Sequence, residues 1–342
     1  AVAGGITGVV TMPNTKPATD SAETVKYIIE KAEGSGVTIY PSACITKGLS
    51  GQELCDYESL KKAGATVITD DGRPVENPDM LFKALQLSKE NGLLVACHCE
   101  DLDIIDGGII NKGKISEELG VKGMDRLSED SITERDILLC EKAEAKIHIC
   151  HVSTKGSAEI IRNAKKRGVR VTCETCPHYF IYTDEKLIMK DADYRMNPPL
   201  REEEDRQAII EAILDGTIDC IVTDHAPHAA EEKADFLKAP NGVVGLETSL
   251  AATLTALYHT GKVSLSKIVS LMSENPRRIA GAEVAEIKVG SKADMTIFDP
   301  DEEWVVVPSE LKSKSKNTVF KGEKFKGKAK AIINGNIIKS NI

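Results

Sequence analysis

The chain has 342 residues, a formal net charge of −9 and a hydrophobic fraction of 41%. The length is too great for one small domain and fits a barrel of about 250 residues with an appended segment. The acidic balance argues against a nucleic-acid partner, because nucleic-acid backbones bind clustered Lys and Arg. No apolar run approaches the roughly 18 residues of a membrane span, so the sequence predicts a globular protein without a membrane partner.

The nine cysteines are scattered through apolar segments and lack the spacing of a disulfide framework. This pattern predicts reduced thiols and a cytoplasmic location. Cys173 and Cys176 form a CxxC pair, which could serve redox chemistry or supply half of a zinc site. No second pair accompanies it, so packing in the core is the favoured interpretation.

Apolar, β-branched runs alternate with helical patterns along most of the chain, as is typical of a parallel α/β fold. The first run ends at Pro13 and Pro17, and Ser21 then starts a helix with Glu23 in its first turn. The predicted strands are residues 6–12, 37–43, 65–69, 93–97, 146–150, 169–174 and 218–223. The predicted helices are residues 21–33, 51–63, 78–90, 130–144, 154–167, 202–214, 246–259, 264–273 and 275–281.

Seven β/α units fall one short of a closed parallel barrel, which has eight strands. An open doubly wound sheet is less favoured, because no Gly-rich phosphate turn follows the first strand. The sequence therefore predicts an α/β fold of the TIM-like (β/α)8 barrel type lacking its first strand. The start at Ala1-Val2-Ala3, without Met or a signal peptide, fits the expectation that an N-terminal segment is missing.

Residues 1–285 are expected to form the barrel and residues 286–342 a small β appendage, because short strands and turns follow Ile287. A Gly-rich, mixed-charge stretch at 101–125 interrupts the alternation and is predicted to be a long loop. Loops of this length in a compact domain often cover a functional site, so this one is a candidate lid.

Polar side chains follow most of the predicted strands, at the end where parallel barrels carry their chemistry. They are Asn14, Asp70, Asp71, His98, His151, His178 and Asp224. Carboxylates and imidazoles that converge at one rim are the ligands of hydrolytic zinc sites. Each one alone would be interpreted as a core residue or a helix cap, but their recurrence at successive strand ends favours a metal site. His148, inside its strand, and His259, on a helix, are assigned structural roles.

Six motifs carry a resemblance to a known family. They are MPNTKP at 12–17, TDDGRPV at 69–75, HCED at 98–101, HVST at 151–154, MNPPLR at 196–201 and TDHAPHAAEEK at 223–233. Together they resemble the bacterial class I dihydroorotases of the amidohydrolase superfamily, with all motifs in order from residue 1 to about residue 300. TDHAPH and MNPPLR are specific, because allantoinases and dihydropyrimidinases resemble the scaffold but not these runs.

The resemblance implies that Asp71 bridges two zinc ions, that His98 and His151 bind the second ion, and that Asp224 binds the first. Asp224 would also act as the general base and acid. Substrate-binding roles are implied for Asn14, Asn197, His228, Asn241 and Gly242. Asn241 departs from the family pattern, which often has Phe at this position.

The family's first zinc also needs an HxH pair, followed by an Arg, on the first barrel strand. No HxH occurs in these 342 residues. A full-length site of this family would hold two zinc ions, whereas this chain is expected to hold one zinc ion or none well and to turn over substrate slowly.

The implied function is zinc-dependent, reversible interconversion of N-carbamoyl-L-aspartate and (S)-dihydroorotate in pyrimidine biosynthesis. The alternatives are a catalytically silent scaffold subunit and another cyclic-amide hydrolase such as allantoinase. The expected partners are a small anionic substrate and, in an assembly, a second copy of the chain or a carbamoyltransferase.

Overall fold

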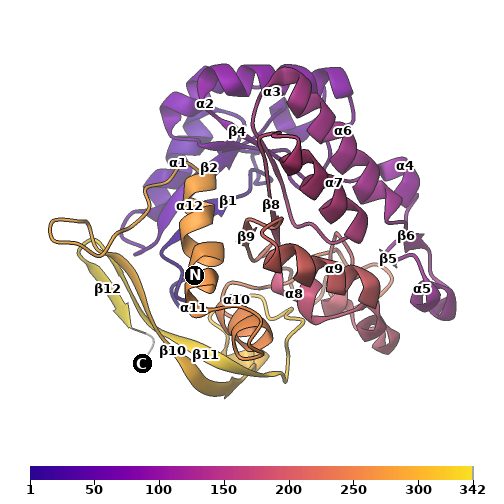
Figure 1. The fold of residues 1–342 in the computed structure, drawn as a ribbon, viewed down its shortest axis with the longest axis vertical. Coiled ribbons are helices and arrows are strands. Elements are labelled where there is room, and N and C mark those ends of the chain that lie inside the picture. The colour runs from indigo at the N-terminus through magenta and orange to yellow at the C-terminus, as the bar shows by residue number, and fades with distance from the viewer. Residues whose placement is uncertain (341–342) are drawn as a thin grey trace.

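The computed structural model describes residues 1–340 and contains a curled sheet of seven parallel strands (Figure 1). The order in the sheet is β1-β2-β3-β4-β7-β8-β9, so each barrel strand lies beside the next one along the chain. These strands are β1 (Gly8–Thr11), β2 (Thr38–Ala43), β3 (Val67–Ile68), β4 (Leu94–Cys97), β7 (Ile147–Ile149), β8 (Val171–Thr175) and β9 (Cys220–Ile221). All seven predicted strands are present, and the TIM-like architecture is confirmed. Within residues 1–340 the sheet ends at β1 and β9.

Helices cover the outer face of this sheet. They are α1 (Ala22–Ala32), α2 (Tyr57–Ala63), α3 (Pro78–Asn91), α6 (Leu127–Ala143), α7 (Lys155–Lys166) and α9 (Glu203–Leu214). The connections after β2 and β8 contain the short helices η1 (Lys47–Leu49), α8 (Pro177–Ile181), η2 (Asp184–Met189) and η3 (Ala192–Tyr194). The main hydrophobic core lies between the two layers and joins Leu81 and Leu85 of α3 to Ile147 and Ile149 of β7. No helix within residues 1–340 is long and apolar enough to cross a membrane.

Capping side chains decide where the helices begin. The predicted helix at 51–63 is too long, because Asp56 accepts hydrogen bonds from the Ser59 N–H and hydroxyl, at 3.1 and 2.7 Å, and starts α2 only at Tyr57. Helix α3 begins where it is predicted, because Asn77 accepts from the N–H groups of Asp79 and Met80.

The stretch at 101–125 is not the unstructured loop that its composition predicts. It contains α4 (Leu102–Ile105), β5 (Ile110–Asn111), α5 (Lys114–Leu119) and β6 (Gly123–Met124), and β5 pairs with β6 in parallel. Its glycines permit this pairing, since a Cβ on Gly108 would lie 2.6 Å from the Gly123 carbonyl carbon. Ile110 and Ile115 are buried in a second hydrophobic cluster, which fixes the segment to the barrel.

The chain after the barrel strands forms short helices and then an antiparallel sheet. The helices are α10 (Ser249–Thr253), η4 (Leu254–Tyr258), α11 (Leu265–Val269), η5 (Ser270–Glu274) and α12 (Asn275–Ile279), of which η4 and η5 are π-helical. The strands are β10 (Asp294–Val305), β11 (Lys324–Asn334) and β12 (Ile337–Ser340), with the 3-10 turn η6 (Pro308–Glu310) between the first two. The sheet lies against one side of the barrel (Figure 1), and Phe320 packs 5.5 Å from the Tyr182 ring.

All nine cysteines are free thiols and all are buried. Cys173 and Cys176, the CxxC pair, are both completely buried. Their place in the core agrees with the favoured interpretation of the pair.

Candidate functional site

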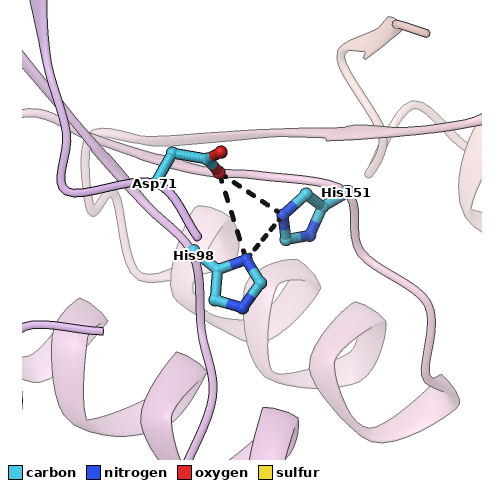
Figure 2. A group of neighbouring side chains, drawn as sticks. All are labelled: Asp71, His98 and His151. Carbon is cyan, nitrogen blue, oxygen red and sulfur yellow. Dashed lines mark hydrogen bonds and ion pairs between the residues drawn. The ribbon is translucent and has the colours of Figure 1, made fainter. Parts of the chain in front are cut away.

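Three side chains meet just beyond the carboxyl ends of three strands. Asp71 follows β3, His98 follows β4 and His151 follows β7, and the parallel arrangement brings these ends to one rim. Figure 2 shows the two imidazoles beside the carboxylate. His98 Nδ1 lies 2.9 Å from His151 Nε2, while Asp71 Oδ1 lies 4.0 Å from the first nitrogen and 3.8 Å from the second.

These three donor atoms fit a metal ion. In a tetrahedral zinc site with bonds of about 2.0–2.1 Å, neighbouring ligand atoms lie roughly 3.4 Å apart. The three observed separations bracket this value. Two ring nitrogens 2.9 Å apart also need a proton or a cation between them, because two facing lone pairs repel. The group is therefore a candidate metal centre.

A second carboxylate orients His98. Glu100 Oε2 lies 2.5 Å from His98 Nε2 and accepts a hydrogen bond from Asn197 Nδ2 at 2.8 Å. A carboxylate on the outer nitrogen of a histidine ligand fixes the ring orientation and the tautomer. Glu100 is not among the predicted site residues, although it stands two positions after His98, where an extended backbone turns both side chains to one side.

The two neighbouring aspartates have different roles. Asp70 is buried and accepts hydrogen bonds from the N–H groups of Ile45 and Thr46, at 2.8 and 3.1 Å, so it ties the end of β3 to the segment after β2. Asp71 faces the histidines instead. Adjacent residues at a strand end point to opposite sides, which leaves one of the pair for the site.

Charges within the group shift the pKa values of its members. Burial alone would lower the pKa of His151, but the neighbouring Asp71 carboxylate and the charge of Asp224 raise it to about 9. Burial alone would raise the pKa of Asp71, but the neighbouring imidazoles of His151 and His98 lower it. The site thus favours an ionised carboxylate, which is the form that binds a cation.

Asp224 lies near this group without joining the three donor atoms. It lines the same cavity as Asp71 and His151. Burial raises its pKa to about 6, although the charges of His151 and His98 oppose the shift. Asp224 and His151 both have left-handed backbone conformations, with φ values of 44° and 34°. Such conformations are uncommon outside glycine and concentrate at functional sites.

Two of the predicted substrate-binding residues lie beside the three donors. Asn14 lines the cavity, and a Cβ placed on Gly72, next to Asp71, would lie 3.6 Å from Asn14 Nδ2. Asn197 Nδ2 lies 3.5 Å from His98 Nε2. Both amide groups are therefore within reach of a small molecule bound over the three donors.

The other predicted substrate-binding residues form a separate unit. His228 Nε2 lies 2.9 Å from the Asn241 carbonyl oxygen. Gly242 has a φ of 138°, and a Cβ there would lie 2.7 Å from Ala226 Cβ and 2.9 Å from His228 Nε2, so only glycine fits. Among the hydrogen bonds of residues 1–340, none joins this unit directly to the three donors.

A buried lysine holds that unit in place and is not among the predicted site residues. Lys233 Nζ donates to the carbonyl oxygens of Pro240, Gly242 and Arg195, at 2.9, 3.1 and 3.2 Å. Burial lowers its pKa to about 8. Lys233 is the last residue of the TDHAPHAAEEK run, so its place in this motif was the sequence feature that could have indicated a role at the site.

His178, predicted at the rim, lies outside the three-donor group. It is buried in α8, and its ring makes a T-shaped contact with Tyr179 at 4.2 Å. Its Nε2 has no hydrogen-bond partner among the described residues. Burial lowers the pKa of His178 to about 3, so its ring is neutral in the folded protein.

Comparisons with known proteins relate the chain to one family and one fold. A family model described as "Dihydro-orotase-like" matches residues 1–157. A dihydroorotase from Acetivibrio thermocellus is 47% identical over 341 residues, which cover 99% of this chain and 80% of that protein. A dihydroorotase from a Geobacter species has the same identity and coverage. Among solved structures, an L-hydantoinase (dihydropyrimidinase) from Arthrobacter aurescens superposes with a TM-score of 0.87 at 26% identity, covering 99% of this chain and 78% of that chain.

The match extends over 99% of the chain, so the segments that carry Asp71, His98 and His151 lie within the compared region. The chain belongs to the dihydroorotase family.

Proposed function

We propose that this chain is a zinc-dependent cyclic amide hydrolase that interconverts N-carbamoyl-L-aspartate and (S)-dihydroorotate. The observation that carries the proposal is the meeting of Asp71, His98 and His151 at the rim of the barrel. The identity with dihydroorotases supports the substrate. One carboxylate and two imidazoles support zinc, which prefers nitrogen ligands together with oxygen.

A bound zinc ion would polarise the ring carbonyl and make water acidic near neutral pH. The residues of the chain supply the remaining steps. Asp224 lines the cavity beside Asp71 and His151, where it can accept the proton of the attacking water and pass it to the departing amide nitrogen. In the direction of ring closure, Asp224 moves the proton the opposite way.

The substrate is an anion, and a chain with a net charge of −9 does not attract it as a whole. Hydrogen-bond donors at the rim must hold it instead. Asn14 and Asn197 are proposed to do so beside the three donors, and His228 from the neighbouring unit. Asn241 and Gly242 are proposed to contact the substrate through their backbone and to fix His228.

The test compares turnover of dihydroorotate, allantoin and hydantoin by the zinc-loaded chain. We expect opening of dihydroorotate with a kcat/KM at least about 100-fold above the other two, because buried polar groups left unpaired by a wrong substrate reduce its turnover. Asp224→Asn should lower kcat by about 100-fold or more while binding of dihydroorotate persists. Asp301→Asn, on β10, is the control and should leave kcat and the binding of dihydroorotate unchanged.

The alternatives give different results in the same assay. Preference for allantoin or hydantoin would assign the chain to another cyclic-amide hydrolase. Binding of dihydroorotate without turnover of any of the three compounds would identify a scaffold subunit.

A further inference from the structure

A second set of possible ligands lies inside the barrel, away from the rim. His148 on β7, Glu174 on β8 and Cys220 on β9 occupy three adjacent strands. Glu174 and Cys220 are directly paired in the sheet register, and His148 is paired with Thr172. His148 lies within β7, whereas His151 follows the carboxyl end of that strand, so His148 is further into the barrel than the rim donors.

The donor atoms of this interior group converge. One nitrogen, one carboxylate oxygen and one sulfur all lie within 4.8 Å of one another. His148 Nε2 lies 3.0 Å from Glu174 Oε2. A zinc ion with bonds of about 2.0 Å to nitrogen or oxygen and 2.3 Å to sulfur needs ligand separations of roughly 3.4–3.6 Å, so small side-chain adjustments suffice.

The outer nitrogen of His148 is already held. His148 Nδ1 lies 2.8 Å from Thr172 Oγ1, and that hydroxyl lies 3.5 Å from the Ile147 carbonyl oxygen. If the Thr172 hydroxyl donates to this carbonyl, it accepts a hydrogen bond from His148 Nδ1–H. The proton of the neutral imidazole is then on Nδ1, and Nε2 carries a lone pair. That lone pair then faces the Glu174 carboxylate, and either a proton or a metal cation must lie between them.

The interior group is reachable through a cavity. All three side chains line one cavity of about 1160 Å³, which Asp71 and His151 also line. Its other walls include the apolar residues Val10, Val67, Leu94 and Ala96. An apolar wall with a few convergent polar groups is the usual form of a ligand site.

We propose that His148, Glu174 and Cys220 form a second site, for a thiophilic divalent cation of the zinc and cadmium class. Burial raises the pKa of the Cys220 thiol, so the free site holds S–H. On binding, the S–H bond breaks, the proton leaves through the cavity to solvent, and the sulfur–metal bond forms without any change of oxidation state. The bound cation cross-links the edge strand β9 to β7 and β8, independently of the reaction at the rim.

Cadmium titration of the intact chain tests this site. A thiolate bound to cadmium gives a charge-transfer band in the near ultraviolet, and the rim donors Asp71, His98 and His151 contain no sulfur, so the band does not come from the rim. Because the chain has nine free thiols, the cysteine variants assign the band to one of them. We expect the band to saturate at one cadmium ion per chain. Cys220→Ser should abolish it, and His148→Gln should weaken cadmium binding by about tenfold or more.

Cys150→Ser is the matched control, because Cys150 lines the same cavity outside the interior group and should retain the band. Circular dichroism establishes that each variant is folded. Absence of the band in the unmodified chain would show that a proton alone lies between His148 and Glu174, and would overturn the proposal. A band that survives Cys220→Ser would overturn it equally.

Discussion

Glu100 contacts no substrate in the proposed reaction, yet it controls one of the metal ligands. Its carboxylate lies 2.5 Å from His98 Nε2, and Asn197 holds it from the other side at 2.8 Å. We expect Glu100→Gln to weaken zinc binding by about 10–100-fold, because an amide no longer fixes the tautomer that presents Nδ1 to the metal. Competition with a chelator measures the affinity. Glu90→Gln, on the exposed face of α3, is the control; equal affinities in the two variants would rule out this role.

Gly242 shapes the unit that contains His228. Gly242→Ala places a Cβ 2.9 Å from His228 Nε2 at a φ of 138°, so the imidazole must move. If the moved His228 loses a substrate contact worth about 1.4 kcal/mol, KM rises about tenfold, whereas kcat should change less. Gly216→Ala is the matched control, because Gly216 also has a positive φ, of 84°, but nothing lies within 4 Å of its added Cβ. Equal KM values in both variants would show that crowding of His228 has no effect.

His178 makes stability depend on pH. Its pKa is lowered from 6.5 to about 3 by burial, so between these values the unfolded chain binds a proton that the folded chain does not. The free energy of unfolding should therefore fall as the pH drops below about 6.5, by up to about 1.4 kcal/mol per pH unit from this residue. Urea unfolding at pH 7 and pH 5 measures it, and His178→Gln should lose less stability over this interval. Equal losses in variant and parent would contradict a neutral buried ring.

Single residues differ in how well the sequence predicts them. His98 and His151 were predictable because each follows an apolar strand, and parallel strands deliver their ends to one rim. The strand pattern left Asp70 and Asp71 as alternatives, and the family resemblance favoured Asp71. Glu100 and Lys233 were not predictable, because their roles depend on contacts with Asn197 and with the carbonyls near Gly242, which the strand pattern does not specify.

A buried arginine is one of the links between the segment at 101–125 and the barrel. Arg201 donates to Ser153 Oγ at 3.0 Å, Asn111 Oδ1 at 3.2 Å and Glu129 Oε2 at 3.3 Å, and both charged side chains are at most 5% exposed. Asn111 belongs to β5, so this network connects the segment to α6 and to the end of β7.

We expect Arg201→Met to lower the free energy of unfolding by about 3–5 kcal/mol, because it leaves the Glu129 carboxylate buried without its partner. Denaturant unfolding measures the change. Arg162→Met, which breaks the more exposed pair with Asp215, should cost at most about 1 kcal/mol. Similar losses in the two variants would contradict the structural role of Arg201.

The elements were predictable where hydrophobic period and capping agree. Helix α3 combines an apolar stripe with Asn77 before it and Gly92 after it, and its limits follow. The start of α2 depends on which of several polar residues caps it, and the pairing of β5 with β6 depends on close backbone contact at Gly108 and Gly123. Neither feature produces a periodic pattern of hydrophobic residues, so the sequence does not predict it.

At the scale of the whole molecule, the two ends of the chain are held together. Thr296 Oγ1 donates to the Gly5 carbonyl oxygen at 2.6 Å, and Asn334 Nδ2 donates to the Thr7 carbonyl oxygen at 3.2 Å. Arg277 binds Asp294 at 2.9 Å. The change of pattern near Ile287 is visible in the sequence, but the contacts of Gly5 and Thr7 join positions 291 and 327 residues apart and have no local signal.

All chemical roles assigned to the rim depend on Asp71, His98 and His151 binding one metal ion together. Anomalous diffraction at the zinc absorption edge, from crystals of the zinc-loaded chain, tests this most directly. We expect an anomalous peak between Asp71 Oδ1, His98 Nδ1 and His151 Nε2, at bonding distance from all three atoms. Zinc bound only elsewhere in the chain, with the rim empty, would contradict the metal centre and the hydrolase mechanism built on it.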